Sequence, residues 1–374
     1  MGVKEAYHQS EVGIIPKDWN ISTLKELTKS IISGRSKSGM QNGTFPVYGS
    51  TGIIGHTEHP DYEGEAILVA RVGANAGKIN KVSGKYGVTD NTIIVKIRED
   101  NSFSFIAQLL EIKKLNHLVF GSGQPLITGS QLKSLQFAVP KLAEQEHIAK
   151  VLIDTDKLLE NLSQLIIKKK KIMLATMQKL LTGKTRLRGF TKEWKKKQLG
   201  EILVYEQPTK YLVYNTNYND MFDIPVLTAG KTFYLGYTNE KTGIYKNLPA
   251  IIFDDFTTVS KYVNFNFKVK SSAMKILTLR NKSSNLEFIY QIMQMIPFKI
   301  GEHKRHWISE YSKLEVNIPD REEQNTITNI LSLMQKEINL LMKNKDKALK
   351  LKLSIMQELL SGKTRLIKLD ATNV

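Results

Sequence analysis

The sequence contains no cysteine and no long apolar run. The first absence excludes disulfides, iron–sulfur clusters, cysteine zinc sites and thiol nucleophiles. The second excludes a membrane span, which needs roughly 18–20 consecutive apolar residues, and the first residues also lack the apolar core of a signal peptide. We therefore expect a cytoplasmic protein that does not insert into a membrane.

Catalytic motifs are also missing. The sequence has no Gly-rich nucleotide loop, no helicase motif and no Asn-Pro-Pro-Tyr-like tetrapeptide for methylation of a base amino group. Potential metal ligands occur only as pairs without a further obvious ligand: His56 with His59, His303 with His306, and Asp254 with Asp255. The sequence predicts no catalytic residue, no metal site and no cofactor bound by this chain.

Positive charge is abundant. The chain has 54 Lys and Arg against 36 Asp and Glu, a formal net charge of +18. Such an excess attracts a polyanion, and because membrane insertion is excluded, nucleic acid is the expected partner. At 374 residues with ordinary hydrophobic content, the chain is expected to form two or more globular units.

The chain repeats itself. Residues 139–187 and 318–366 align without a gap at an offset of 179, and a weaker similarity links residues 13–27 with 189–202. The shared residues include Pro140 and Pro319, Glu144-Gln145 and Glu323-Gln324, Met177-Gln178 and Met356-Gln357, Trp19 and Trp194, and a closing GKTRL. The whole chain is therefore interpreted as a tandem duplication whose intervening segments have diverged.

Each long repeat predicts one helix. Apolar residues recur at steps of three and four from Glu144 to Leu181 and in the second copy, with no Gly or Pro. Helices of this length need a partner, so we expect the two to pair antiparallel as a coiled coil. The predicted interface residues are Ile148, Leu152, Leu159, Leu162, Met177, Ile327, Leu331, Ile338, Leu341 and Met356.

Gly183 and Gly362 suit helix ends. A phosphate-binding loop would need another glycine five residues before each GK, where Gln178 and Gln357 stand. The GKT tripeptides are therefore read as helix C-terminal caps.

The segments between the helices contain short β-rich runs, which predict mixed α+β domains. The expected fold is α+β, with two similar globular domains separated by two long antiparallel helices and related by approximate two-fold symmetry. The expected boundaries are 1–140, 141–183, 184–318 and 319–374. In a DNA-binding protein, this arrangement predicts two half-sites separated by a fixed gap. A helical hairpin that merely joins two domains is the simpler alternative.

Polar residues beside the predicted strands are the candidate DNA contacts, because loops on a rigid scaffold carry recognition. Arg, Asn and Gln suit base edges, and Lys suits phosphates. In the first domain the candidates are Ser50, Arg71, Asn75, Lys78, Ser122 and Gln124, and in the second they are Lys231, Thr258, Lys261, Lys304, Arg305 and His306, with Trp307 or Tyr262 as stacking groups.

The pattern resembles the specificity (S) subunits of Type I restriction-modification systems. The resemblance covers essentially the whole chain and rests on the Pro-x3-Glu-Gln entries at 140–145 and 319–324 and the Met-Gln-x-Leu-Leu-x-Gly-Lys-Thr-Arg-Leu exits at 177–187 and 356–366. FPVYGSTGIIG (45–55) and ILVARVGANAGKI (67–79) also look like the opening of such recognition domains.

The resemblance implies a non-catalytic subunit that binds double-stranded DNA at a bipartite target, one half per domain. It implies two methylation (M) subunits that use S-adenosylmethionine to methylate adenine N6, and two restriction (R) subunits that use ATP and magnesium. Two alternatives stay open: a stand-alone DNA-modifying or cleaving enzyme with unrecognised motifs, and a scaffold that binds no DNA. DNA binding that weakens steeply with salt would distinguish the scaffold.

Overall fold

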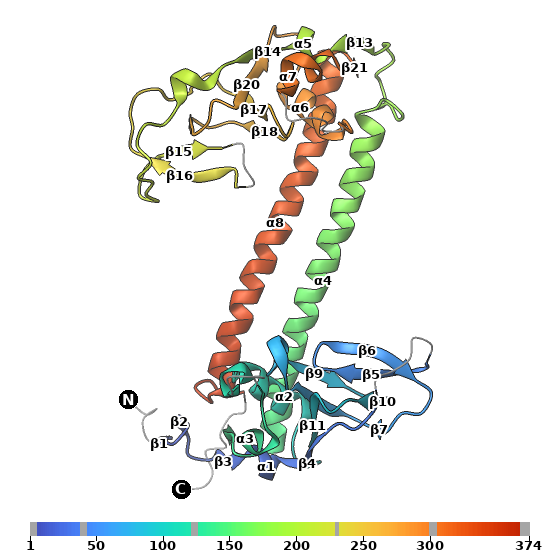
Figure 1. Cartoon of the computed structure of the whole chain (residues 1–374), viewed down its shortest axis with the longest axis vertical. Helices are drawn as coiled ribbons and strands as arrows, with labels where there is room; N and C mark the ends of the chain where they lie inside the picture. The colour runs from blue at the N-terminus through green and yellow to red at the C-terminus, as the bar shows by residue number, and fades with distance from the viewer. Residues whose placement is uncertain (1–5, 38–42, 121–125, 229–231, 299–304, 367–374) are drawn as a thin grey trace. The chain divides into compact units, whose positions relative to one another are not determined.

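The computed structural model describes residues 6–37, 43–120, 126–228, 232–298 and 305–366. The chain divides into two compact units: unit 1 comprises Met1–Ser163 with Asn344–Val374, and unit 2 comprises Gln164–Lys343. Two long helices, α4 (Leu142–Leu180) and α8 (Arg321–Leu360), each contribute one part to each unit (Figure 1).

Unit 1 contains two four-stranded sheets. The antiparallel central sheet has the order β4 (Thr28–Ser33), β11 (Thr92–Ile97), β8 (Ala66–Ala70), β9 (Ile79–Val82). The second has the order β6 (Gly52–Thr57), β5 (Phe45–Gly49), β10 (Lys85–Val88), β7 (Tyr62–Glu63), and β5 and β10 run parallel. Every residue of β8 is buried, as its continuous apolar run predicts for a central strand.

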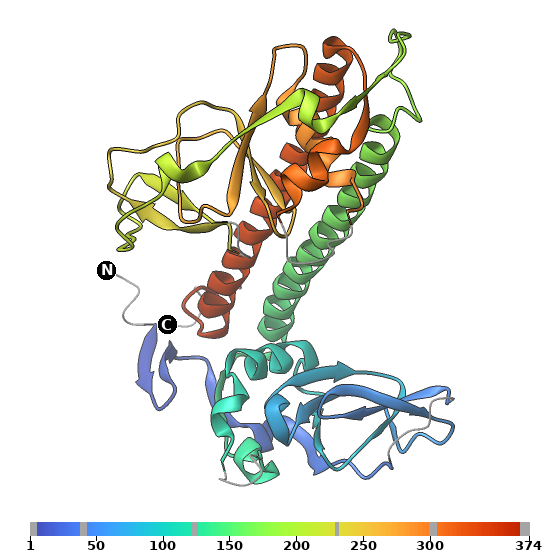
Figure 2. The same ribbon diagram turned by 45° about the horizontal axis from the view of Figure 1, so that its top comes forward.

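The remaining elements of unit 1 connect this domain to the long helices. They are β1 (Tyr7–Ser10), β2 (Gly13–Pro16), β3 (Asn20–Thr23), α1 (Leu24–Leu27), α2 (Phe103–Ile112), α3 (Gly129–Lys133) and β12 (Gln136–Val139), with short 3-10 turns at Gly73–Asn75 and Leu115–Leu118. The β1–β2 hairpin lies beside the end of α8, where Tyr7 Oη donates to the carbonyl of Gly362 at 3.0 Å (Figure 2).

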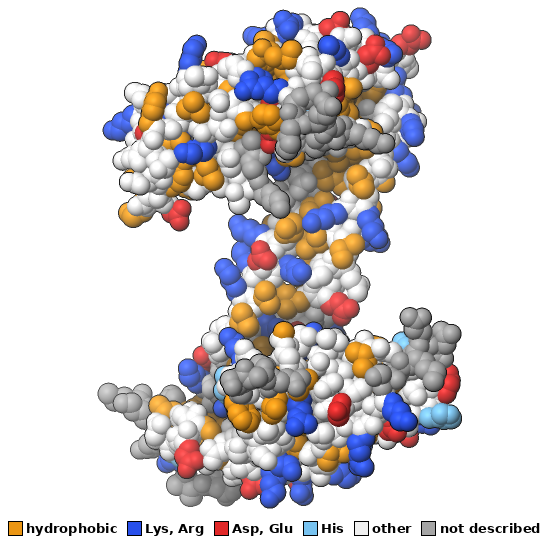
Figure 3. Space-filling view, in the orientation of Figure 1, with side chains coloured by type: hydrophobic (Ala, Val, Ile, Leu, Met, Phe, Trp, Pro, Cys, Tyr) orange, Lys and Arg blue, Asp and Glu red, His pale blue; other side chains and the backbone are white. Residues whose placement is uncertain are grey.

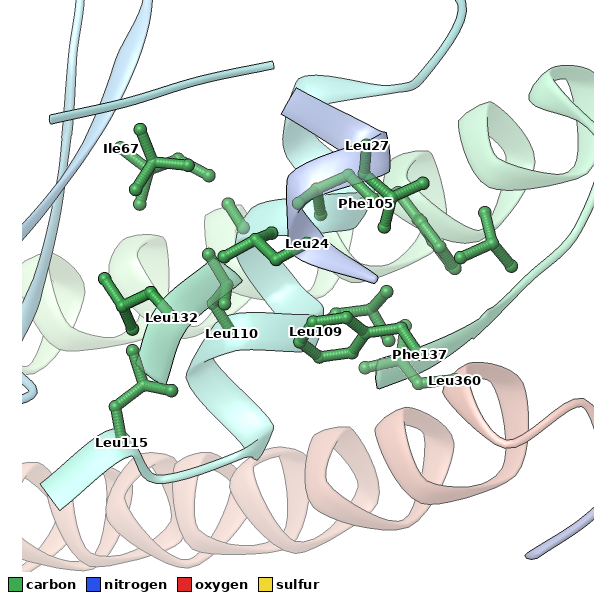
Figure 4. Packing of buried hydrophobic residues seen from close by; sticks show 14 of the residues in the cluster. Leu24, Leu27, Ile67, Phe105, Leu109, Leu110, Leu115, Leu132, Phe137 and Leu360 are labelled. Carbon is green, nitrogen blue, oxygen red and sulfur yellow. The ribbon is translucent and has the colours of Figure 1, made fainter. Parts of the chain in front are cut away.

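The main core of unit 1 joins the domain to both long helices. Leu109 of α2 and Phe137 of β12 pack near Leu360 of α8, and Ile148 and Leu152 of α4 belong to the same buried cluster (Figure 4). Because these residues are shared between the helices and the domain, the start of α4 and the end of α8 are integral parts of this domain's core.

Unit 2 repeats this architecture. Its antiparallel central sheet has the order β14 (Leu203–Glu206), β20 (Met274–Leu279), β17 (Ala250–Asp254), β18 (Ser260–Val263). The second sheet has the order β16 (Tyr234–Thr238), β15 (Ile224–Leu227), β19 (Lys268–Val269), with β15 and β19 parallel.

Its connecting elements are β13 (Lys195–Gln198), α5 (Leu199–Ile202), α6 (Leu286–Met295), α7 (His306–Ser309) and β21 (Glu315–Ile318), with 3-10 turns at Pro208–Tyr211 and Tyr311–Lys313. The predicted α+β class is therefore confirmed, and the duplication extends into segments whose sequences have diverged.

Within each unit the two long helices run antiparallel. In unit 1, Lys352 Nζ of α8 lies 2.5 Å from Asp156 Oδ1 of α4. In unit 2, Lys169 Nζ of α4 lies 2.7 Å from Glu337 Oε1 of α8. A second ion pair in each unit, Arg365 with Glu144 and Arg186 with Glu323, gives the direction: residue numbers rise along one helix where they fall along the other, as the sequence predicts.

The predicted interface positions differ in burial. Six are buried: Ile148, Leu152 and Met356 in unit 1, and Ile327, Leu331 and Ile338 in unit 2. Four are half-buried: Leu159, Leu162, Met177 and Leu341. The apolar stripe is wider than the seam between two helices, which leaves residues such as Leu174 and Leu353 more than half exposed, at 52% and 55%.

Candidate nucleic-acid interface

A clamp formed around a buried glutamate fixes each domain to the long helices. In unit 1, Arg365, which follows α8, donates from Nε and Nη2 to the two carboxylate oxygens of Glu144 on α4 at 2.6 and 2.8 Å. Trp19 Nε1 donates to the same carboxylate at 3.2 Å. Asp18 accepts two further bonds from Arg365 at 2.8 Å each, and these bonds raise the pKa of Arg365 and lower the pKa of Asp18.

Unit 2 builds the same clamp with the roles of the helices exchanged. Arg186, which follows α4, donates from Nε and Nη2 to Glu323 of α8 at 2.7 Å each, and Trp194 Nε1 adds a bond of 3.2 Å. These three residues align with Arg365, Glu144 and Trp19 of the other copy. The Trp, Glu and Arg residues that recur in the two sequence copies are thus residues that contact one another in each unit.

The glutamine after each clamp glutamate orients a domain helix. Gln145 Oε1 accepts from the amide of Ser102, the N-cap of α2, at 2.9 Å, and Gln324 Oε1 accepts from Asn285, the N-cap of α6, at 2.8 Å. Each glutamine also donates to the carbonyl of the proline five residues before it. The Pro-x3-Glu-Gln motif therefore sets the position of each domain on its helix.

A polar loop follows the central strand of unit 1. After β8, Arg71 begins a compact turn that ends at Lys78, closed by backbone bonds of 2.8 Å from Gly77 to Ala70 and 2.9 Å from Lys78 to Asn75. Gly77 has φ +89°, and a Cβ there would lie 2.5 Å from a backbone nitrogen, so this turn requires glycine.

Two other segments of unit 1 meet this loop. The amide of Ile127 donates to the carbonyl of Arg71 at 2.8 Å, which brings the segment before α3 beside it. The amide of Arg71 donates to Asn91 in the β10–β11 turn at 2.9 Å, and the amide of Thr89 in that turn donates to Tyr48 near the end of β5 at 2.9 Å. The β5–β6 turn that holds Ser50 therefore lies at the same edge of the domain.

The equivalent edge of unit 2 is built from the β17–β18 hairpin. The carboxylate of Asp254 accepts from the amides of Phe256 at 2.9 Å and Thr257 at 3.3 Å. Thr258 adopts φ +57°, a conformation that a β-branched residue rarely takes. The amide of His306 donates to the carbonyl of Asp255 at 2.8 Å, which places the start of α7 beside the hairpin.

The two edges share one backbone pattern. In unit 1, the carbonyl of Arg71, the residue after β8, accepts from the amide of Ile127. In unit 2, the carbonyl of Asp255, the residue after β17, accepts from the amide of His306. Backbone positions are thus conserved where side chains are not, and this is the arrangement expected of a common frame that carries different recognition residues.

Comparison with known proteins identifies the family of the two domains. A family model described as a Type I restriction modification DNA specificity domain matches the chain twice, over residues 16–171 and 191–351. The chain belongs to this specificity family. The resemblance predicted from the repeated motifs is therefore confirmed.

Individual relatives match the specificity chain to different extents. The EcoR124I/EcoR124II specificity subunit of Escherichia coli is 54% identical over 138 residues, which span 36% of this chain and 34% of the relative. The putative MjaX specificity subunit of Methanocaldococcus jannaschii is 23% identical over 97% of both chains. The solved S subunit from M. genitalium shares the fold, with a TM-score of 0.67 over 91% of this chain and 96% of that chain at 17% identity. The chain thus spans about a third of the E. coli relative's length.

The structure places most of the predicted DNA contacts of the specificity chain at the two edges. Lys78, Lys261 and Arg305 are exposed, and Ser50, Arg71, Asn75 and Thr258 are half-buried. His306 is only 1% exposed, and its ring packs against Phe298. Ser122, Gln124, Lys231 and Lys304 lie outside the described residues.

The two predicted stacking groups belong to the interior of unit 2. Trp307 is 2% exposed, and half-buried Tyr262 packs against the same core cluster.

Sequence reasoning missed two groups of functional residues. The clamps were visible as repeated Trp, Glu and Arg, and antiparallel helices would have brought these residues together. The second group is the buried pair of Asp255 and Lys275, whose side chains are each 1% exposed. In the sequence, Asp255 is one of two adjacent acidic residues in an expected turn, and such a pair gives no signal for burial.

Two negative findings apply to the described ranges of the specificity chain. Among those residues, no group of three or more His, Asp or Glu side chains is arranged to hold a metal ion. No helix within the same ranges is long and apolar enough to cross a membrane.

Proposed function

We propose that the chain is the DNA-recognition subunit of a Type I restriction-modification complex and that it reads a bipartite double-stranded target. The observation that carries this proposal is the presence of two equivalent polar edges, one in each unit, on frames fixed by the same clamp. Each edge reads one half-site. Because α4 and α8 both extend from one unit into the other, helix length sets the gap between the half-sites.

Positive charge supplies the first stage of binding. The net charge of +18 attracts the phosphate backbone without regard to sequence, and exposed Lys261 and Arg305 lie at the edge of unit 2. Asn75 and Arg71 in unit 1 are of the residue types that pair with adenine and guanine edges. Phosphate contacts therefore fix the register of the protein, and the two edges supply sequence discrimination.

The exposed apolar residues of the long helices are the proposed docking surface for methylation subunits. Ile172 and Leu174 in unit 2 are 44% and 52% exposed, and the residues 179 positions later, Leu351 and Leu353 in unit 1, are 59% and 55% exposed. Apolar side chains stand among lysines on these helices (Figure 3). Two copies of one patch suit two M subunits.

In this assignment the chain itself catalyses nothing. The two M subunits bind S-adenosylmethionine and methylate adenine N6, and two R subunits use ATP and magnesium for cleavage. The complex acts on DNA in the cytoplasm.

We also infer that one half-site is shared with the E. coli EcoR124I/EcoR124II subunit. The 138 matched residues are as many as one recognition domain contains, and their identity of 54% contrasts with the 23% found for a relative matched along the whole chain. Such local similarity is expected when one reading domain is shared and the other is not. Methylation maps of both complexes would show one common half-site, and two unrelated targets would contradict the inference.

The test of the main proposal is methylation in a methylation-free host. The chain is co-expressed with the M subunit of its own locus, and N6-methyladenine is mapped across the genome by long-read sequencing. We expect a single split motif with a constant gap. An uninterrupted motif, or methylation without any motif, would contradict the two-edge assignment, and methylation by the chain without M would favour the stand-alone enzyme.

A further inference from the structure

Asp255 holds together the reading edge of unit 2. Its backbone amide donates to the carbonyl of Ala273 at 3.2 Å, and its carbonyl accepts from the amide of His306 at 2.8 Å. Its side-chain Oδ1 accepts from the amide of Trp307 at 2.8 Å. One residue thus connects the β17–β18 hairpin, the entry to β20 and the start of α7.

The Asp255 carboxylate is fully enclosed. Lys275 Nζ of β20 lies 3.5 Å from its Oδ2, and both side chains are 1% exposed. The ammonium also lies 4.9 Å from the centroid of the Tyr205 ring. A carboxylate buried in this way cannot contact a base, so its role concerns the segments bonded to it.

Those segments carry the other edge residues of unit 2. Arg305 directly precedes the amides held by Asp255, and Thr258 and Lys261 follow it on the hairpin. Trp307, whose amide is held, packs against Phe253 at 5.2 Å between ring centroids. The position of Arg305 relative to the hairpin is therefore set by Asp255 through both its carbonyl and its side chain.

Unit 1 reaches the same backbone arrangement differently. The equivalent residue is Arg71, whose carbonyl also accepts from the following segment. Its side chain is half-buried, and Thr128 there caps α3 with its own side chain. The hydrogen bond between the Asp255 carboxylate and the Trp307 amide therefore has no counterpart at Arg71 in unit 1.

We propose that Asp255 is a positioning residue for sequence discrimination by unit 2, acting through its side-chain bond to the Trp307 amide, and that Lys275 neutralises its buried charge. Buried ion pairs contribute little net stability, because desolvation offsets their attraction. The role that we assign to this pair is therefore to hold the surrounding backbone groups in one geometry. The inference rests on the proposed function and names the residue that fixes one of its two reading edges.

Two double variants separate the bond from the charge. Asp255→Asn with Lys275→Met removes both charges and keeps an acceptor for Trp307, whereas Asp255→Ala with Lys275→Met removes both charges and the acceptor. Each is co-expressed with the M subunit, and methylation is mapped as for the wild type. Arg305→Ala, which removes a side chain of a type that pairs with guanine edges, identifies which half-site belongs to unit 2.

We expect the Asn variant to keep both half-sites. One correct base pair contributes roughly 5- to 150-fold in discrimination against a wrong base. In the Ala variant, this discrimination should fall by about tenfold or more at one or more base pairs of the unit 2 half-site. The other half-site and the gap should stay unchanged, which serves as an internal control for folding and assembly.

Hydrogen exchange on the full chain without DNA adds a second readout. The Trp307 amide should exchange faster in the Ala variant than in the Asn variant. Equal motifs or equal exchange in the two variants would overturn the proposal, as would loss of both half-sites in the Ala variant. If the wild-type complex itself gives no split motif, the proposed function fails and this inference fails with it.

Discussion

Removal of Arg365 should destabilise unit 1 selectively. In Arg365→Met, the Glu144 carboxylate loses both guanidinium bonds and keeps the Trp19 indole bond at 3.2 Å. The Glu144 side chain is 3% exposed and the Arg365 side chain 14%, so water replaces little of what is lost.

The magnitude follows from this burial. Removing one partner of a buried ion pair costs about 3–5 kcal/mol. The remaining indole bond and the favourable field at the N-terminus of α4 reduce this cost. We therefore expect Arg365→Met to lower the free energy of opening of unit 1 by roughly 2–4 kcal/mol.

The assay is amide hydrogen exchange on the full chain, followed by mass spectrometry. Exchange through local opening in residues 142–152 should accelerate by roughly 30- to 700-fold. Residues 321–331, which form the equivalent helix start in unit 2, should not change. Arg188→Met, at an exposed position, is the matched control and should leave both segments unchanged.

The Glu144→Gln variant completes the test. With the carboxylate already neutral, adding Arg365→Met should cost clearly less than it does in the wild-type background, because no uncompensated buried charge is left behind. Unchanged exchange in 142–152, or equal acceleration in both units, would refute the view that each clamp stabilises its own unit.

Four further outcomes are expected. Bonding to Arg365 lowers the pKa of Asp18 below its ordinary value of 3.8. The contribution of Asp18 to folding stability is therefore complete above pH 3.8 and is lost as the pH falls through the lower folded-state pKa. Asp18→Asn should flatten that part of an acid titration followed by tryptophan fluorescence. Arg71→Ala and Arg305→Ala should each relax sequence discrimination at a different half-site, and the same half-site responding to both would contradict the two-edge assignment. Four residues inserted into both α4 and α8 should lengthen the gap by roughly two base pairs, with both half-sites unchanged. Leu174→Ser with Leu353→Ser should abolish co-purification with M while DNA binding persists.

The helices and the duplication were predictable because their signals are local and repeated. The predicted span from Glu144 to Leu181 differs by one or two residues from the observed Leu142–Leu180. Periodicity could not separate the buried Leu152 from the exposed Leu174, because both lie on one apolar stripe that is broader than the seam.

The candidate site was less predictable because residue type does not report burial. The sequence HKRHW suggests an exposed basic cluster, yet the amides of His306 and Trp307 bond to Asp255, and both side chains are buried. Asp255 itself has the appearance of an ordinary turn residue in sequence. Its role depends on Lys275, which lies 20 positions away and reaches it only through the pairing of β17 with β20.

The division between repeated and diverged residues explains how such a chain could change its target. Trp19, Glu144 and Arg365 recur in the other copy because each clamp must fix a domain to the helices in the same way. Arg71 and Asp255 differ although their backbones make equivalent bonds, so an exchange of side chains at the edges leaves the frame intact. In the proposed function, a new half-site therefore requires changes at one edge only, provided that the bonds that position this edge, such as the Asp255 bond in unit 2, are kept or replaced.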